Sequence, residues 1–388
     1  MDQEEINAEP KIDPERQKQA KEYARINQRL MLLDLFISGL YMLTWLLFGW
    51  SEALKGWLER LTPNDWLLVI LYVIIFGGIL LIINLPLSFY QGFTLPHKYE
   101  LSTQNLVGWI SDLVKSMILG GIVGMIVLEI IYAVLREYPT MWWLWVAMIL
   151  LVFNLILEYI APTLLMPLFN KFVPLGEDHE ALAERLMSLA QKSGTFVRGV
   201  FKFDMSRRTK QANAGLTGLG NTRRIIIGDT LLNDFTPDEI ETVMAHELGH
   251  QVNKDIPSGI LFGSLTTLVG LYLAAMGLNW GVEFFKFEGS ADIAAFPLLV
   301  LVLGLYGLVT MPLENGFSRW REKRADEYAL RLTHNGYAYA SALKRLANQN
   351  LADTEPEAWV EWLLYSHPAL GKRIAMAERE IEHHSRKT

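Results

Sequence analysis

Long apolar runs separated by shorter polar stretches dominate the hydrophobic pattern of this chain. About 20 predominantly apolar residues are enough for an α-helix to cross a bilayer. Six runs meet that length, at residues 31–50 and at about 66–88, 108–135, 141–164, 257–280 and 293–313. The pattern therefore predicts a mainly α-helical integral membrane protein with about six transmembrane helices.

Three polar regions interrupt or flank these runs. Residues 1–30 are charged, and we expect 13–30 to form a surface helix that runs into an uncleaved first span, because the leader is too long for a signal peptide. In residues 170–256, the pattern predicts a helix at 177–192, strands at 196–205 and 223–230, and a helix at the end of the segment. The predicted organisation is an N-terminal helix (1–30), a four-span region (31–169), a polar segment (170–256), a two-span region (257–313) and a C-terminal segment (314–388).

Charge predicts how these regions face the membrane. Six Lys/Arg residues lie between Lys11 and Arg29, whereas the first opposite loop has only Lys55 and Arg60. By the positive-inside rule, both termini and the 170–256 segment face the cytoplasm. We therefore expect a multi-pass protein of a prokaryotic plasma membrane with these segments on the cytoplasmic side.

Ionisable residues inside the predicted spans are costly in lipid and need a wet interior or a partner. Two interpretations remain open, a water-filled chamber and a packed bundle with internal ion pairs. Asp112 and Lys115 are one turn apart and form an obvious pair. The ionisable residues in the spans are Asp34, Asp112, Lys115, Glu129 and Glu158.

Composition narrows the chemistry. The chain has 388 residues, 51% of them hydrophobic, no cysteine and a net charge of −7. Without cysteine, disulfides, thiolate zinc sites and a cysteine nucleophile are excluded, so metal ligands must be His or carboxylate. The basic residues form no stripe with interleaved aromatic residues, so we expect no nucleic-acid partner.

A metal-binding motif lies at the end of the 170–256 segment. His246 and His250 are four residues apart and share one face of a helix, so both can bind one Zn²⁺, and Glu247 can reach a metal-bound water. Residues 236–239 read as a threonine N-cap, a proline and a glutamate that closes a capping box. The alternative is a chance occurrence of the motif on an amphipathic helix.

The motif still needs a third ligand on the same side of the membrane. Glu283 and Glu288 lie in an opposite loop, and Asp255 is too close on the same helix to turn back to the metal. Glu322 and Asp326 share a helix face just after the sixth span. Glu322 is therefore the candidate ligand and Asp326 its supporting partner, and the alternative is a solvated charged helix.

At this point the chain resembles a known family. The His246–His250 motif with Glu322-x-x-Ala325-Asp326 resembles the membrane-embedded gluzincin metalloproteases, specifically the type I CAAX prenyl endopeptidases. Similar segments also occur at 167–175, 213–215, 224–232 and 366–373. The resemblance implies a gluzincin-type α+β zinc protease domain built from the segment before span five and the C-terminal region.

The expected mechanism is peptide-bond hydrolysis by zinc-activated water. His246, His250 and Glu322 would bind one Zn²⁺ per chain and leave its fourth position to water. Glu247 would act as general base and then protonate the leaving amine. His367 is the candidate donor to the oxyanion, as the resemblance also implies, and the alternative is a turn residue before a helix that begins at Pro368.

Other site residues are expected around this centre. Arg373 could pair with Asp326, or it could be an ordinary surface arginine. Asn213, Ala214 and Gly215 resemble the family's substrate-binding strand, and the alternative is a flexible loop. The family usually has a bulky residue where this chain has Gly215, which leaves the substrate preference open.

The expected partners are the lipid bilayer and a peptide or protein substrate, with or without a prenyl group. The family has seven spans and this chain shows six, the first being the one that is missing. A quality-control protease like HtpX shares the metal motifs but has fewer spans. From other classes, a peptide-binding scaffold and a transporter remain as alternatives, although the first has no need of Glu247 and the second would need a fourth ligand to close a structural zinc site.

Overall fold

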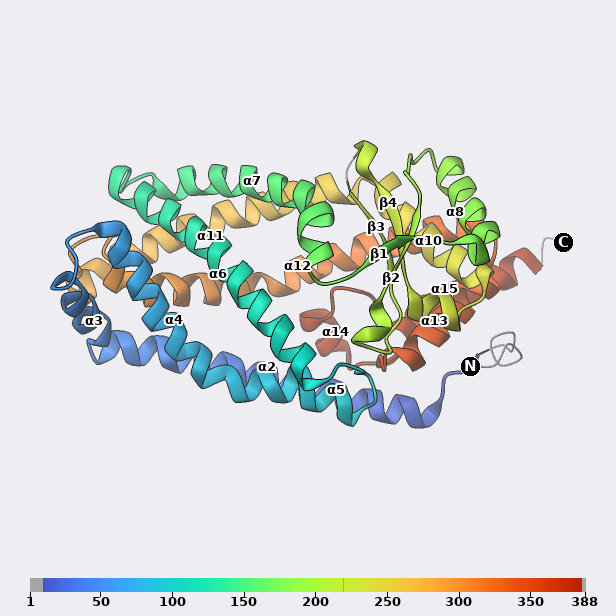
Figure 1. The fold of residues 1–388 in the computed structure, drawn as a ribbon, viewed down its shortest axis with the longest axis horizontal. Helices are drawn as coiled ribbons and strands as arrows, with labels where there is room; N and C mark the ends of the chain where they lie inside the picture. Colours follow the sequence, from blue (N-terminus) through green and yellow to red (C-terminus); the bar gives the residue numbers. More distant parts are fainter. Residues whose placement is uncertain (1–9, 219, 386–388) are drawn as a thin grey trace.

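A computed structural model describes residues 10–218 and 220–385. The remaining parts of the predicted N-terminal and C-terminal segments, 1–9 and 386–388, lie outside the described residues. The molecule is elongated, with long helices at one end and a small sheet covered by shorter helices at the other (Figure 1).

Six helices are long and apolar enough to cross a membrane within the described ranges, which confirms the predicted number of spans. In the most apolar 18-residue stretch of each span, the buried share of residues is 6% in the fourth span and 33% in the sixth. Most of this apolar surface is therefore free to contact lipid. The helices that form these spans are α2 (Pro14–Leu47), α4 (Asp65–Phe89), α6 (Leu106–Glu137), α7 (Trp142–Ile160), α11 (Asp255–Phe285) and α12 (Phe296–Thr333).

Two of these helices are longer than the predicted spans. The expected surface helix at 13–30 and the first span form one helix, α2, whose first turn is capped by the Asp13 side chain. The sixth span and the helix that carries Glu322 likewise form one helix, α12. A transmembrane helix therefore continues directly into the polar region. The short helices α3 (Trp50–Glu59) and α5 (Leu95–Lys98) lie between the early spans.

The sheet has four strands in the order β1-β2-β4-β3. The predicted strands are present but shorter, as β2 (Val200–Phe203) and β4 (Arg224–Gly228), which pair in parallel. The third, β3 (Ala214–Thr217), pairs antiparallel with β4 and forms one edge of the four-stranded sheet. The strand β1 (Phe172–Pro174), which the hydrophobic pattern did not predict, pairs antiparallel with β2.

Shorter helices cover this sheet and share one hydrophobic core with it (Figure 1). The predicted helix at 177–192 begins as a 3₁₀ turn and continues as α8 (Glu180–Lys192). The other helices of this region are α9 (Asp229–Asp234), α10 (Pro237–Val252), α13 (Gly336–Gln349), α14 (Ala358–Leu364) and α15 (Leu370–Ser385).

The two helices that carry the metal motif and Glu322 touch at the level of their backbones. A Cβ atom added to Gly249 of α10 would lie 3.0 Å from the Cα atom of Ala325 on α12. Only glycine allows so close an approach. This contact places the histidines of α10 directly against the acidic face of α12.

The ionisable residues of the spans do not share one environment. Asp112 pairs with Lys115 at 3.7 Å, as predicted, but its shorter contact is with Arg208 of the polar region, at 2.7 Å. Glu129 is buried, and neither carboxylate oxygen has a hydrogen-bond partner among the described residues. Glu158 is exposed and lines a cavity beside the metal motif. Ion pairing therefore explains Asp112, whereas Glu158 faces an open space.

Candidate active site

Helix α10 begins with the capping box that the sequence predicts. The backbone N–H of Glu239 donates to the Thr236 hydroxyl, and the Thr236 N–H donates to the Glu239 carboxylate. The other oxygen of Glu239 accepts a hydrogen bond from Arg345 of α13, at 2.8 Å. Since both side chains are buried, this ion pair fixes the start of α10 against the helix behind it.

The three predicted metal ligands converge on one point. The Nε2 atoms of His246 and His250 are 3.2 Å apart. The Glu322 carboxylate oxygens lie 3.3 Å from the first and 3.4 Å from the second. Tetrahedral zinc bonds of about 2.0–2.1 Å separate neighbouring ligand atoms by about 3.3 Å. These donors therefore fit a divalent metal, and the buried Oε2 of Glu322 lacks a hydrogen-bond partner within the described structure, as a metal ligand would.

A buried polar network holds His246 from behind. Its Nδ1 atom lies 2.8 Å from Asp326, which also accepts hydrogen bonds from Arg373 at 2.6 and 2.9 Å and from the Tyr339 hydroxyl. Burial alone would lower the pKa of His246, but the negative charges of Asp326 and Glu322 beside it outweigh this effect and raise that pKa. A metal ion would therefore compete with a proton for this imidazole.

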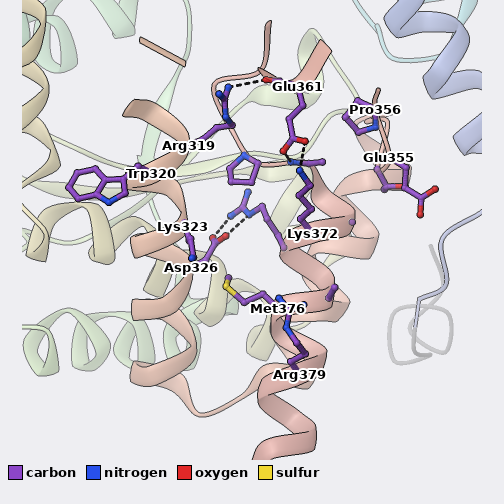
Figure 2. Close-up of a pocket in the computed structure, with 16 residues that line it drawn as sticks. Arg319, Trp320, Lys323, Asp326, Glu355, Pro356, Glu361, Lys372, Met376 and Arg379 are labelled. Atoms are coloured by element: carbon purple, nitrogen blue, oxygen red, sulfur yellow. Dashed lines mark hydrogen bonds and ion pairs between the residues drawn. The ribbon is translucent and has the colours of Figure 1, made fainter. Parts of the chain in front are cut away.

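Asp326 also forms part of the wall of a cavity of about 720 Å³, which Figure 2 shows. The ion pair between Lys372 and Glu361 lies at the same cavity (Figure 2). The predicted contact between Arg373 and Asp326 is present in the structure, and Arg373 is mostly buried rather than a surface arginine. Tyr339 was not predicted, because a single tyrosine on an amphipathic helix carries no signal of this contact.

The second histidine has a partner that the sequence interpretation rejected as a ligand. Helix α10 ends at Val252, and Lys254 adopts a left-handed conformation with φ of 58° that turns the chain. Asp255 therefore begins a new helix, and its Oδ2 atom lies 2.8 Å from Nδ1 of His250. The assumption that Asp255 continues the same helix was wrong. It is not part of the ligand group, yet it can orient His250 through the nitrogen that does not face the metal.

Glu247 lies between the ligands and the free edge of the sheet. A Cβ atom added to Gly215 would lie 3.9 Å from the Glu247 carboxylate, so β3 runs alongside the site. Asn213 and Ala214 precede Gly215 there, and the Asn213 carbonyl accepts a hydrogen bond from Gly228 of β4 at 2.9 Å. Of the predicted substrate-binding residues, Ala214 and Gly215 belong to this edge strand, and Asn213 directly precedes it, so the segment is not a flexible loop.

His367 reaches the site from the loop between α14 and α15. Its Nε2 atom lies 3.3 Å from Glu322 Oε1. Desolvation of the ring lowers the pKa of His367. The negative charge of Glu322 acts in the opposite direction, but its effect is smaller. The buried Glu361 carboxylate holds the loop by accepting hydrogen bonds from the backbone of Ala369 and from Lys372. The alternative interpretation made His367 a turn residue before a helix that begins at Pro368. Helix α15 begins two residues later, at Leu370.

A second cavity, of about 750 Å³, lies on the other side of the ligands. His250 and Asp255 form part of its wall, and so does Thr217 at the end of β3. Most of the remaining wall comes from α7, the turns that follow it and α11, including Leu157 and Ile260, and Arg321 of α12 completes it. The metal-binding motif is therefore accessible from the region where the membrane helices meet the sheet.

Comparison with known proteins identifies the family. Residues 5–171 match the family described as CAAX prenyl protease N-terminal, five membrane helices, and residues 177–381 match peptidase family M48. The metalloprotease YhfN of Bacillus subtilis is 30% identical over 365 residues, covering 93% of this chain and 85% of the relative. CAAX prenyl protease 1 of Saccharomyces cerevisiae is 32% identical over 314 residues, covering 76% of this chain and 68% of the relative.

The fold is also that of a solved structure. Ste24p of S. mikatae aligns with a TM-score of 0.84 at 24% identity, covering 97% of this chain and 93% of that protein. The match to the membrane region of the CAAX prenyl proteases does not favour the HtpX-like alternative, and the peptidase match identifies an enzyme rather than a scaffold or a transporter. This chain therefore belongs to peptidase family M48 and is a membrane metalloprotease of that family.

Proposed function

We propose that the protein is a zinc endopeptidase in which His246, His250 and Glu322 bind one Zn²⁺. The observation that carries the proposal is the convergence of their three ligand atoms within 4.8 Å of one another. Glu247 directly follows the first of these ligands in the sequence. Bound zinc would supply Lewis-acid chemistry, by polarising the scissile carbonyl and acidifying water. Three protein ligands are the number found at catalytic zinc sites, where one position stays open.

The side chains around the ligands would then divide the remaining work. Glu247 takes a proton from the attacking water and delivers it to the leaving amine. His367 donates a hydrogen bond to the oxyanion, for which a neutral imidazole is sufficient. Asp326 and Arg373 do not reach the substrate, and they position His246 through its Nδ1 atom.

The substrate would bind in an extended conformation beside β3. That strand has a free edge, and backbone hydrogen bonds along it would fix the peptide register with little dependence on sequence. Gly215 lies on this edge next to Glu247, and Asn213 and Ala214 directly precede it in the chain. Gly215 leaves room there for a bulky substrate side chain.

For the substrate class, we propose a membrane-associated peptide that carries a prenyl group. The yeast relative is a CAAX prenyl protease by name. The cavity beside His250 has apolar residues of α7 and α11 in its wall, and it is large enough for a lipid chain. The charge asymmetry of the loops supports an active site on the cytoplasmic side of a prokaryotic plasma membrane.

The test is zinc content together with cleavage of a fluorogenic farnesylated peptide by the purified full chain. Glu247→Gln should retain stoichiometric zinc and lose activity by a factor of about 10²–10⁴, since a positioned general base contributes about that much. Glu327→Gln is the matched control, because Glu327 lies on the ligand helix beside Asp326 but contacts Lys323 instead of the metal site.

Each outcome decides between the parts of the proposal. A wild-type protein without zinc would refute the metal site, and a fully active Glu247→Gln variant would refute the general base. Equal cleavage of the farnesylated and the unprenylated peptide would refute prenyl recognition while leaving the endopeptidase mechanism intact.

A further inference from the structure

One face of α2 stays exposed over the whole length of the helix. In its apolar half this face carries large side chains, with Phe36 67% and Leu47 66% exposed. The same face continues towards the N-terminus as four exposed cations. Along the helix these positions are spaced by three or four residues, which keeps them on one side: Lys18, Lys21, Arg25, Arg29, Leu32, Phe36, Leu40, Leu43 and Leu47.

The opposite face fixes the rotation of the helix. Tyr41 and Trp45 are buried in the core of the membrane region, and Ala20 is buried against Leu95 and Tyr99. Beyond the membrane, Gln17 donates a hydrogen bond to the carbonyl of Ala352 and accepts one from Thr354. These contacts at both ends prevent α2 from turning its exposed face inwards.

The four cations, which we call the basic stripe (Lys18, Lys21, Arg25 and Arg29), have no ion pair or hydrogen bond to side chains in the described part of the chain. The acidic residue nearest to them, Glu22, lies 3.9 Å from Lys98. Lys98 therefore compensates the negative charge of Glu22.

The position of the basic stripe relative to the bilayer follows from helix geometry. If Leu32 marks the edge of the hydrocarbon core and α2 runs along the bilayer normal, a rise of about 1.5 Å per residue puts Arg29 about 4–5 Å and Arg25 about 10 Å beyond that edge. The headgroup region adds about 5–7 Å to each side of the hydrocarbon core. Long arginine side chains at these heights reach the phosphate level, where a guanidinium can bind a phosphate through two hydrogen bonds.

The two lysines lie further out and act at longer range. Lys21 and Lys18 are about 16 and 21 Å beyond Leu32. At physiological ionic strength the Debye length is about 8 Å, so they add attraction without direct contact to the phosphates. In a helix that was only solvated, we would not expect the cations to lie on the same side as the lipid-exposed apolar side chains.

We propose that the basic stripe binds the headgroups of anionic phospholipids in the leaflet on the side of the metal site. The arginines contact the phosphates directly, and the lysines strengthen the attraction. Lipid bound there holds α2 at a fixed depth, next to the chain around Thr354 that leads into α14 and the His367 loop.

The test measures lipid selectivity of the full chain in nanodiscs of phosphatidylcholine with a minor fraction of phosphatidylglycerol. Electron paramagnetic resonance of spin-labelled lipids gives the relative association constant of the two lipids at the protein surface. The wild type should prefer phosphatidylglycerol, and 0.5 M NaCl should reduce that preference. Arg25→Gln/Arg29→Gln should lower it by about fivefold for each arginine that contacts a headgroup.

Two variants separate this effect from a general loss of charge or fold. Lys192→Gln/Arg198→Gln removes two exposed cations away from α2, at the end of α8 and in the chain that follows it, and it should leave the preference unchanged. Arg25→Lys/Arg29→Lys keeps the charge and should retain most of the preference. Wild-type selectivity in Arg25→Gln/Arg29→Gln would overturn the proposal, and so would an equal loss in the distant double variant.

Discussion

Asp255→Asn tests whether the carboxylate behind His250 contributes to metal affinity. Asp255 is 3% exposed, and its Oδ2 atom lies 2.8 Å from Nδ1 of His250. The carboxylate accepts a hydrogen bond from the Nδ1–H group, which would leave Nε2 free to bind the metal. Asparagine keeps an oxygen of the same size at this position but loses the charge, and a charge-assisted hydrogen bond is about twice as strong as a neutral one.

Loss of such a partner lowers metal affinity by about 10–100-fold. Because asparagine still accepts a hydrogen bond, we expect the lower end, about tenfold, which corresponds to about 1.4 kcal/mol. Asp255→Ala should approach the upper end, since it leaves the Nδ1 proton without a partner. The assay is competition between the apo-protein and a zinc chelator of known affinity in detergent.

Asp234→Asn is the control, because Asp234 accepts a hydrogen bond from Gln349 at 2.9 Å and lies outside the metal network. Its zinc affinity should equal that of the wild type. An Asp255→Asn variant that binds zinc as tightly as the wild type would refute the role of this carboxylate. Equal losses in both variants would refute it as well, because the effect would then not be local.

Three further changes test other parts of the structure. Burial raises the pKa of Glu361, but the hydrogen bonds from Lys372 and the Ala369 backbone outweigh it, so the folded pKa is lowered. Its stabilisation is complete above the unfolded pKa of about 4.3 and is lost at lower pH, so the thermal midpoint of Glu361→Gln should fall less than that of the wild type between about pH 5 and about pH 3. Parallel curves would contradict this. Gly249→Val should separate α10 from α12 and reduce the zinc content, and full occupancy would exclude backbone contact as the cause of ligand convergence. Asp112→Asn should weaken the contact with Arg208 and lower the thermal midpoint by the equivalent of about 1–2 kcal/mol. The zinc content should stay unchanged and serves as the control measurement. An unaltered thermal midpoint would contradict this prediction.

The sequence predicts most reliably where a local rule determines the structure. The capping box at Thr236, the helical spacing of His246 and His250, and the shared face of Glu322 and Asp326 all follow from rules that act within one helix. The structure has each of these features. Apolar runs likewise predicted the membrane helices, because the thickness of the bilayer sets their minimum length.

Features that depend on contacts between distant segments were missed. The hydrophobic period gives no sign of the left-handed residue Lys254, which ends α10 and allows Asp255 to reach His250. The strand β1 has three residues and exists because it pairs with β2, so its own sequence contains too little pattern to predict it. Asp112 was assigned to Lys115 by proximity in sequence, whereas the fold adds Arg208 as its shorter contact.

The unbroken helix α12 has a consequence for how the enzyme matures. The two histidines precede α11, and Glu322 follows the membrane-spanning part of α12. With the proposed ligands, a newly made chain would have an incomplete ligand set until this helical pair had crossed the bilayer and returned. Metal binding would in this way be coupled to correct insertion, and a chain that failed to insert would lack the assembled site with which it could cleave other proteins.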